Sequence, residues 1–400
     1  MNRSYKFLIV FLYVYLLSFS VLKTIGLPDR WAVAHWLMDY RFGFIKRGLG
    51  GEIFGFFLEK TEFNILMVSA VILVMLYLAL LVIAVRETWK EYSFNKVLFY
   101  LIFFLSQYAV LSMHLMGYFD HLIMLTTIIS VYLIRNKMIL IPALLTTFCI
   151  VVHEISLFLM VPVCLFAFLA NEIQDNKLVF NQTLFKKLGF YLLFPLVAVV
   201  SISFYQESYG NKNFQAIYTY LQNTGKIKER VAYSVAAAYT ESFSNYLKSE
   251  LPYFLKRVFV SKCTIKYGIP LLFMMYMVYR ELQKTDIRLL MVLAAVSVSP
   301  LLLHAIAWDT PRIWAFPFMM LFLCFWILRD RCRVKDLSGN TLSWLEITFF
   351  LIAVALVSLF PNILFHSQKE NFSLPVRLIV LVPVFAILIY LYKKAPAKSS

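Results

Sequence analysis

Four short polar clusters interrupt an otherwise apolar chain, and they carry the side-chain types that bind anions and move protons. The first joins a carboxylate to three basic residues and the others set carboxylates beside histidine or arginine: Asp39-Tyr40-Arg41 with Lys46-Arg47, Asp120-His121, His153-Glu154 and Asp309-Thr310-Pro311-Arg312. Ionisable groups that adjoin lipid-embedded segments are costly unless paired, and they usually mark function. The alternative is interfacial anchoring through ion pairs, including a local i,i+3 pair between Asp309 and Arg312.

The stretch from Asp39 to Glu52 is the richest in candidate ligands for an anion. Its glycines, among them Gly48, Gly50 and Gly51, let backbone N–H groups approach an anion closely, and an arginine offers a planar fork that matches phosphate oxygens. We therefore interpret it as a phosphate-binding loop. A tight turn whose basic residues touch lipid head groups is the alternative. No nucleotide-binding fingerprint is present, because the strand–loop–helix context is absent.

The elements that position these clusters are hydrophobic helices. Of the 400 residues, 61% are hydrophobic and 15% are charged, whereas soluble domains carry about 25% charged residues. The chain contains about twelve runs near the length that crosses a bilayer: Phe7–Leu22, Asn64–Val85, Val97–Leu115, His121–Ile134, Met138–Val152, Ile155–Ala170, Leu188–Tyr205, Tyr267–Tyr279, Leu289–Ala307, Ile313–Leu328, Leu345–Phe360 and Leu378–Tyr392. We predict an all-α, polytopic transmembrane bundle that forms a single domain over residues 1–400.

The basic residues predict the orientation. Lys and Arg are concentrated in the short connections on the N-terminal side, such as Arg86 to Lys96, Arg329 to Lys335 and Lys393 to Lys398. Cytoplasmic loops carry this excess, so both termini are predicted to be cytoplasmic in the inner (plasma) membrane of a bacterium. Each polar cluster follows an odd-numbered span, which puts all four outside. The net charge of +16 is then divided between the two membrane faces, which favours lipid as a partner and argues against nucleic acid.

Two long outer segments stand out. The first, residues 28–63, begins with Pro28-Asp29, which predicts a helix with Asp29 as its N-cap, and continues with Trp31, Trp36 and Leu37 on a short interfacial helix. The second, residues 206–266, is rich in tyrosine and reads as broken helix. Long loops without regular structure are often functional lids. We predict a site in the first segment and a lid in the second.

The positions of charged residues along the predicted spans favour some classes of function over others. Hardly any span carries a charge near its centre, since Glu346 and Arg377 lie near the ends of theirs. Ion-coupled transporters place ionisable groups near the bilayer midplane. A site at the outer rim suits a substrate with a lipid tail and a polar head. Chemistry on lipid-linked molecules is favoured, and a transporter or flippase of lipid-linked saccharides is the alternative.

In its many spans, its acidic residue in the first outer loop and its further polar clusters on that face, the chain resembles the GT-C class of integral-membrane glycosyltransferases and the related Wzy-type O-antigen polymerases. The resemblance implies polyprenyl-linked saccharides as donor and acceptor, in the assembly of O-antigen, capsule or another surface polysaccharide. The first-loop Asp-x-Asp of that class is absent, because Tyr40 and Arg41 follow Asp39. The five cysteines show no metal-ligand spacing. No metal or cofactor is predicted.

The roles expected under this hypothesis divide between proton transfer and substrate binding. Asp39 is the first candidate for the general base, with His153 and Glu154 as the second. Charge-assisted contacts from basic residues would stabilise the leaving phosphate, and further polar residues would orient the sugar. The predicted substrate-binding residues are Arg41, Lys46, Arg47, Asp120, His121, Asp309 and Arg312. The sugar, the linkage, its stereochemical outcome and the oligomeric state stay open.

Overall fold

The computed structural model describes residues 3–332, 342–365 and 368–393. Every predicted apolar run lies on helix: α1 (Arg3–Leu22), α4 (Glu62–Lys90), α5 (Phe94–Leu105) with α6 (Gln107–His114), α7 (Asp120–Arg135), α8 (Leu140–Val152), α9 (Ser156–Asn171), α10 (Gln182–Tyr209), α14 (Lys262–Glu281), α15 (Ile287–Val298) with η5 (Ser299–Ala305), α16 (Thr310–Arg329), α17 (Trp344–Val354) with η6 (Ala355–Leu359), and α18 (Leu374–Lys393). The only strands among these residues are β1 (Ile173–Gln174) and β2 (Lys177–Leu178), an antiparallel pair. The all-α prediction is confirmed for the described part of the chain.

Seven helical stretches of the described residues are long and apolar enough to cross a membrane. They contain α1, α4, α5 with α6, α10, α15 with η5, α16 and α18, and the shorter apolar helices are α8, α9 and α17 with η6. The chain is therefore a membrane protein by the length and composition of its helices, while the count of twelve spans stays a prediction. Part of the charge that predicts the orientation, Arg333, Lys335, Lys394 and Lys398, lies outside the described residues.

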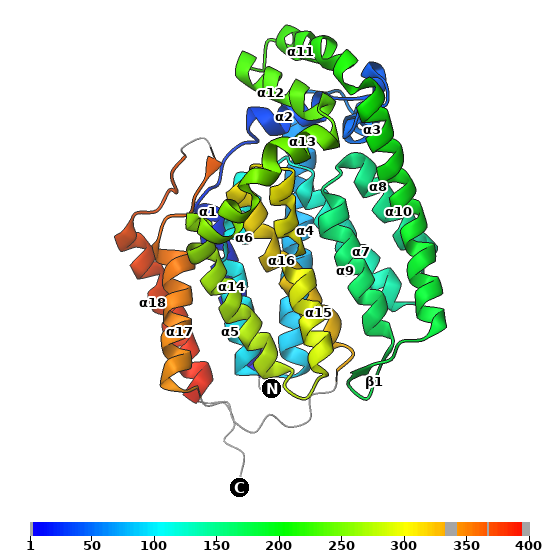
Figure 1. Cartoon of the computed structure of the whole chain (residues 1–400). Helices are drawn as coiled ribbons and strands as arrows, with labels where there is room; N and C mark the ends of the chain where they lie inside the picture. The colour runs from blue at the N-terminus through cyan, green and yellow to red at the C-terminus, as the bar shows by residue number, and fades with distance from the viewer. Residues whose placement is uncertain (1–2, 333–341, 366–367, 394–400) are drawn as a thin grey trace.

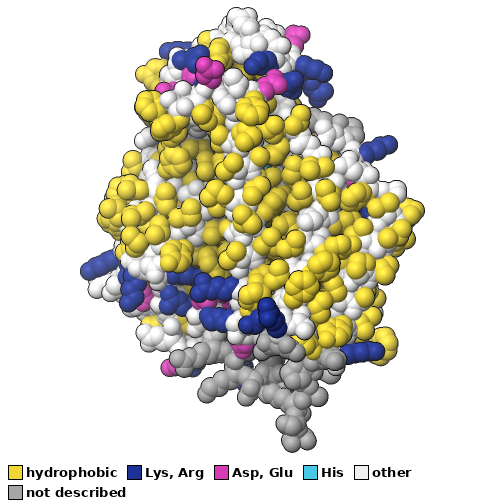
Figure 2. Space-filling view, turned by 180° about the vertical axis from the view of Figure 1, so that it is seen from behind, with side chains coloured by type: hydrophobic (Ala, Val, Ile, Leu, Met, Phe, Trp, Pro, Cys, Tyr) yellow, Lys and Arg dark blue, Asp and Glu magenta, His cyan; other side chains and the backbone are white. Residues whose placement is uncertain are grey.

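The helices stand side by side, and the short outer elements gather at the end of the bundle opposite the start of α1 (Figure 1). These elements are α2 (Arg30–Leu37), η1 (Tyr40–Phe42), α3 (Gly48–Phe57), η2 (Gly210–Asn213), α11 (Phe214–Asn223), α12 (Glu229–Thr240), α13 (Phe243–Glu250), η3 (Leu251–Tyr253) and η4 (Lys256–Val260). Figure 2 shows a broad hydrophobic belt between two zones rich in charged side chains. We call the end that carries α2, α3 and α11–α13 the outer end.

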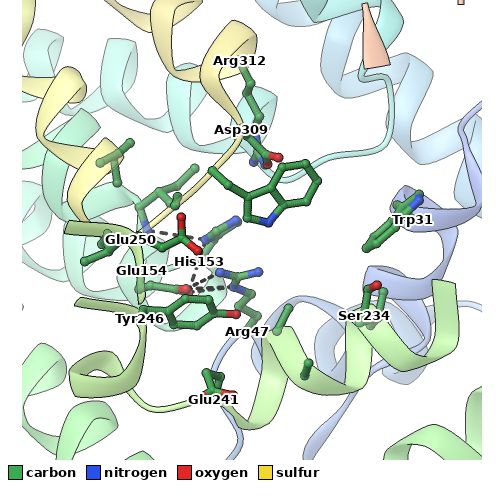
Figure 3. Close-up of a pocket in the computed structure, with 18 of the residues that line it drawn as sticks. Trp31, Arg47, His153, Glu154, Ser234, Glu241, Tyr246, Glu250, Asp309 and Arg312 are labelled. Carbon is green, nitrogen blue, oxygen red and sulfur yellow. Dashed lines mark hydrogen bonds and ion pairs between the residues drawn. The ribbon is translucent and has the colours of Figure 1, made fainter. Parts of the chain in front are cut away.

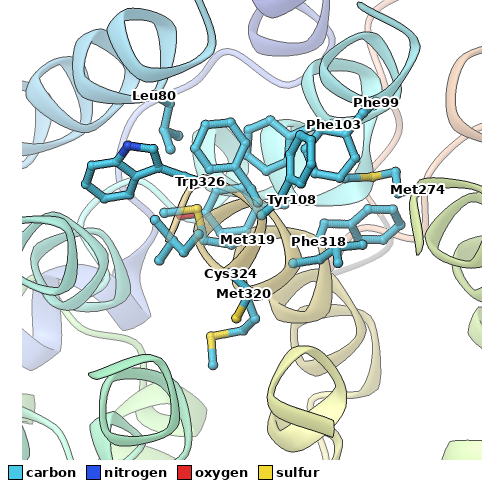
Figure 4. Packing of buried hydrophobic residues seen from close by; sticks show 14 of the residues in the cluster. Leu80, Phe99, Phe103, Tyr108, Met274, Phe318, Met319, Met320, Cys324 and Trp326 are labelled. Carbon is cyan, nitrogen blue, oxygen red and sulfur yellow. The ribbon is translucent and has the colours of Figure 1, made fainter. Parts of the chain in front are cut away.

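Helix α16 lies at the centre of the bundle and fixes the depth of its own first turn. Every residue from Ile313 to Arg329 is buried, and aromatic rings pack closely around the helix (Figure 4), with centroid distances of 4.3 Å between Phe103 and Phe322 and 4.5 Å between Phe99 and Phe325. Interiors packed at this density resist displacement. Asp309, the N-cap of α16, and Arg312 in its first turn are therefore held on a rigid element.

The first outer segment folds through close packing of glycines. Asp29 caps α2 as predicted, because its side chain accepts a hydrogen bond from the backbone N–H of Ala32 at 2.7 Å. The glycines of α3 face neighbouring atoms so closely that a Cβ at Gly51 would lie 1.9 Å from the carbonyl oxygen of Met38, and one at Gly50 would lie 2.5 Å from the ring of Phe119. These glycines let α3 approach α2 and α7, which is a packing role and differs from the anion-binding role that their number suggests.

Replacement of Gly51 by alanine tests this packing. The added methyl group meets backbone, which cannot move aside as a side chain can, so we expect a loss of about 1–3 kcal/mol in the free energy of unfolding. The measurement is the thermal midpoint of the detergent-solubilised protein.

Gly189→Ala is the matched control, because no atom lies within 4 Å of the position of its added Cβ, and it should leave the midpoint unchanged or raise it. Equal midpoints for the two variants would contradict the packing role.

Candidate functional site

A cavity of about 790 Å³ opens at the outer end, between the bundle and the segment that forms α12 and α13. Five predicted site residues line it, from three separate parts of the chain: Arg47, His153, Glu154, Asp309 and Arg312. Figure 3 shows their side chains turned toward the same space. The prediction that the polar clusters share one face holds for these residues, and the volume lies within the range of about 300–1,000 Å³ typical of small-molecule sites.

The first ion pair in the cavity joins Arg47 to Glu154. The Nε of Arg47 lies 3.0 and 2.9 Å from the two carboxylate oxygens of Glu154, and Nη2 also donates to Oε1. His153 Nδ1 lies 3.3 Å from Glu154 Oε2. The turn between α8 and α9 positions both residues, since His153 has an extended backbone and ends α8. Arg47 has a left-handed backbone with φ of 63°, a conformation that costs non-glycine residues free energy and often occurs at functional sites.

The second ion pair joins Arg312 to Asp120. The Nε and Nη2 of Arg312 donate to the two Asp120 oxygens at 2.7 and 2.6 Å. Its Nη1 lies 3.4 Å from Asp309 Oδ2, and its guanidinium carbon lies 4.9 Å from the centre of the Tyr118 ring. The local pair between Asp309 and Arg312 exists, but the closer partner is Asp120. Bidentate pairs of this kind fix the plane of the guanidinium as well as its position.

The two pairs have the same geometry, and both leave one nitrogen for a ligand. Each arginine binds its carboxylate through Nε and Nη2. Among the described residues, Arg47 Nη1 has no hydrogen-bond partner and Arg312 Nη1 has only the long contact to Asp309. The carboxylates thus orient the arginines without saturating them. This arrangement can bind an anion.

The site contains one carboxyl group suited to proton transfer. Burial raises the pKa of Asp309 above its ordinary value, Arg312 offsets part of this rise, and Asp120 adds to it. For Glu154, burial acts in the same direction, but Arg47 and His153 lower its pKa well below the ordinary value. The side chain of Asp309 is 26% exposed, against 8% for Asp120. Asp309 is therefore a part-exposed carboxyl group of the cavity whose pKa is raised, whereas the pKa of Glu154 is lowered.

The structure does not bring Asp39, Arg41, Lys46, Asp120 or His121 to the lining of this cavity, although Asp120 reaches it indirectly as the partner of Arg312. Asp39 accepts a hydrogen bond from Arg41 Nε at 2.7 Å and contacts Lys60 Nζ, and only 8% of its side chain is exposed. Burial raises the pKa of Asp39, but the contacts with Arg41 and Lys60 bring it below the ordinary value. The geometry therefore gives no support to Asp39 as the general base. Arg41 also lies 4.8 Å from the ring of Tyr220.

Lys46 binds the segment that forms α12 and α13, which lines one side of the cavity. Its Nζ donates to the carbonyl oxygen of Glu241 at 2.6 Å and lies 4.7 Å from the ring of Tyr246. Burial lowers the pKa of Lys46 to about 8. At the other end of α13, Glu250 pairs with Arg257 at 2.6 Å. Residues of α12 and α13 line the cavity, and the role of this segment as a lid stays a prediction.

Several lining residues were missed by sequence reasoning. Trp31 and His35 lie one turn apart on α2 and both line the cavity, together with Tyr118 and Trp308. The Nδ1 of His35 lies 3.0 Å from the hydroxyl of Tyr239, and burial together with Arg47 lowers its pKa well below the ordinary value. The spacing of Trp31 and His35, four residues apart, puts both side chains on one face of a helix. The sequence did not identify this face as part of a site, because aromatic residues there also fit a helix that faces lipid.

No group of three or more His, Cys, Asp or Glu side chains among the described residues can hold a metal ion. Three carboxylates of the lining, Glu154, Asp309 and Glu250, each pair with an arginine.

Acidification tests the buried imidazole of His153. Burial and Arg47 lower its pKa to about 4, so the folded protein binds this proton less readily than the unfolded chain, whose histidine pKa is about 6.5. The resulting contribution to stability is full at neutral pH and is lost as the pH falls from about 6.5 to about 4. Between about pH 7 and about pH 5 we expect a loss of about 2 kcal/mol from this residue.

The measurement is the thermal midpoint against pH for the wild type and His153→Gln, which keeps a hydrogen-bonding side chain but cannot titrate. The difference between the two curves should grow on acidification below about pH 6.5. Parallel curves would show that His153 does not titrate as described.

Comparison with known protein families, with curated proteins and with solved structures finds no match to this chain. Its function is therefore argued from the chemistry of the cavity.

Proposed function

We propose that the chain is an integral-membrane glycosyltransferase that acts at the extracytoplasmic face on saccharides linked to undecaprenyl phosphate or diphosphate. It would span the bacterial inner membrane about twelve times with both termini in the cytoplasm, and would act as a Wzy-type polymerase or a GT-C sugar transferase. One observation carries the proposal: two oriented guanidinium groups and two part-exposed carboxylates face one cavity at the outer end of an apolar bundle.

The arginines account for the phosphate of the donor. Breaking the bond between the sugar and a polyprenyl phosphate leaves negative charge on the phosphate oxygens. Arg47 Nη1 is available to that charge, and Arg312 Nη1 can exchange its long contact with Asp309 for it. Charge-assisted hydrogen bonds strengthen as the charge develops. Because Glu154 and Asp120 orient the two groups before the substrate arrives, little reorganisation is needed in the transition state.

Asp309 accounts for activation of the acceptor. In this scheme the acceptor hydroxyl attacks the anomeric carbon, its proton passes to Asp309, and the bonding pair of the cleaved bond leaves with the phosphate. A general base works best when its pKa approaches the working pH, and burial raises the pKa of Asp309. Glu154 is the less suitable base, since Arg47 lowers its pKa.

The remaining lining suits a saccharide. Trp31, Trp308 and Tyr246 present aromatic rings, and Ser234 and Asn245 present neutral hydrogen-bonding groups. Aromatic side chains combine a large apolar face with restricted motion, which matches the apolar face of a sugar ring. Trp308 is 58% exposed and provides a surface beside the charged groups.

The transporter alternative finds less support. Transporters of ions and solutes usually carry polar groups near the midplane on broken helices. The central helix α16 has no charged residue between Arg312 and Arg329, and the cavity lies at the outer end only.

Replacement of Asp309 by asparagine tests the role of the base. The variant keeps the shape and hydrogen-bonding capacity but cannot accept the proton, so transfer should fall by about 100-fold or more. The surface polysaccharide of the native host is resolved by gel. Loss of chain length with one repeat retained indicates a polymerase, and loss of one branch sugar indicates a monosaccharide transferase.

Asp175→Asn is the control, because Asp175 lies in the turn between β1 and β2 at the opposite end and has a positive φ that asparagine tolerates. It should leave the glycan unchanged. An unchanged glycan in Asp309→Asn at normal protein level would contradict the assignment.

Binding of undecaprenyl phosphate tests the arginines without any sugar. The protein in nanodiscs should bind undecaprenyl phosphate more tightly than undecaprenol. Arg47→Gln and Arg312→Gln should each weaken phosphate binding by about 10- to 100-fold, because each loses a hydrogen bond from a charged donor.

Arg288→Gln serves as the control, since Arg288 is 72% exposed and pairs with Asp286 away from the cavity. Equal affinity for the phosphate and the alcohol, or equal affinity in all variants, would rule out the phosphate site.

A further inference from the structure

His121 is enclosed by groups that can only accept hydrogen bonds. Its Nε2 lies 2.6 Å from the carbonyl oxygen of Ser112 and its Nδ1 lies 3.1 Å from the carbonyl oxygen of Tyr118. The residue is 4% exposed. A neutral imidazole has one N–H, so one of its nitrogens would direct a lone pair at a carbonyl oxygen. Both contacts are favourable only when both nitrogens carry hydrogen.

The charges around His121 accommodate the same state. Asp120 precedes it, and Arg312 is the arginine that binds Asp120 from α16. Arg312 also faces Asp309, so one guanidinium serves two carboxylates in a region where Asp120 is 8% and Arg312 is 12% exposed. Buried charges of one sign are costly without a counter-charge. A cationic His121 adjoins Asp120 and is a further counter-charge for it.

The contacts of His121 also fix the turn between α6 and α7. Tyr118, whose carbonyl it binds, stacks on Arg312 at 4.9 Å. The preceding residue, Gly117, has φ of 97°, and its carbonyl oxygen accepts a hydrogen bond from Trp36 Nε1 at 2.7 Å. His121 therefore holds both the ring that covers Arg312 and the start of the helix that carries Asp120.

We infer that both ring nitrogens of His121 carry hydrogen, and that His121 is a positioning residue which orients Arg312 through Asp120 and Tyr118. His121 is absent from the cavity lining and does not touch the substrate. The ionisable groups around it are Asp120 on its own helix, Arg312 and Asp309 at the start of α16, and His153 at the end of α8. The positioning role rests on the proposed function, whereas the charge state does not.

Nitrogen-15 NMR of histidine-labelled wild-type protein tests the charge state near neutral pH, where an exposed histidine is mostly neutral. Both ring nitrogens of His121 should show the chemical shift of N–H nitrogens. The signal is assigned by its absence from His121→Gln. If that variant does not fold, the signal is assigned by elimination, with single substitutions of the other five of the six histidines.

A shift typical of an unprotonated nitrogen at either position of His121 would overturn the inference. This result would leave the glycosyltransferase proposal untouched, because no substrate is present. Conversely, two N–H nitrogens would support the inference even if undecaprenyl phosphate failed to bind.

The positioning role has its own measurement in nanodiscs. His121→Gln should weaken binding of undecaprenyl phosphate by about 3- to 10-fold, less than Arg312→Gln, because the arginine is still present but poorly oriented. Thr127→Val is the control for damage to α7, since Thr127 is fully buried and bonds only to its own helix at Ile123. Wild-type affinity in His121→Gln with a folded protein would overturn the positioning role.

Discussion

Two pairs of guanidinium and carboxylate, Arg47 with Glu154 and Arg312 with Asp120, keep four charges at the end of an otherwise apolar bundle. Charges taken out of water lose hydration free energy, and only close partners with good geometry repay it. Removing one partner of such a pair leaves the other charge unpaired and commonly costs about 3–5 kcal/mol. The cavity can therefore hold oriented cations because each of them is bound to its own carboxylate.

The rest of the fold supports these pairs. The aromatic packing around α16 sets the position of Arg312 and Asp309, and the glycine face of α3 brings Arg47 near the turn that carries Glu154. The segment with α12 and α13 then covers the space, fastened by Lys46 at Glu241 and by Arg257 at Glu250. Three different parts of the chain thus position Arg312 and Asp309, bring Arg47 to Glu154, and cover the cavity.

The helices were predictable because each depends on a local property, a run of apolar residues about as long as a bilayer is thick. Because each polar cluster follows an odd-numbered apolar run, the sequence also predicted that the clusters gather at one end of the bundle. The ion pairs were not predictable, because Arg47 and Glu154 are 107 residues apart and Asp120 and Arg312 are 192 residues apart. Sequence spacing offered only the local pair of Asp309 and Arg312, which is the weaker contact in the structure.

The choice of Asp39 as the base shows the same limit. The sequence shows that the first outer segment contains the carboxylate of Asp39. Its partner Lys60 lies beyond α3, however, and only the folded segment brings the two side chains together. His35 was missed for the opposite reason, since its helix also fits a lipid-facing surface. Residue type was informative at both positions, and the direction of the side chain depended on packing.

The pairing of Asp120 with Arg312 sets an order for biogenesis. Asp120 leaves the ribosome 192 residues before its partner, so α7 is synthesised while this carboxylate has no guanidinium to bind. The cavity end of the bundle therefore stays incomplete until α16, which brings Arg312, has been made.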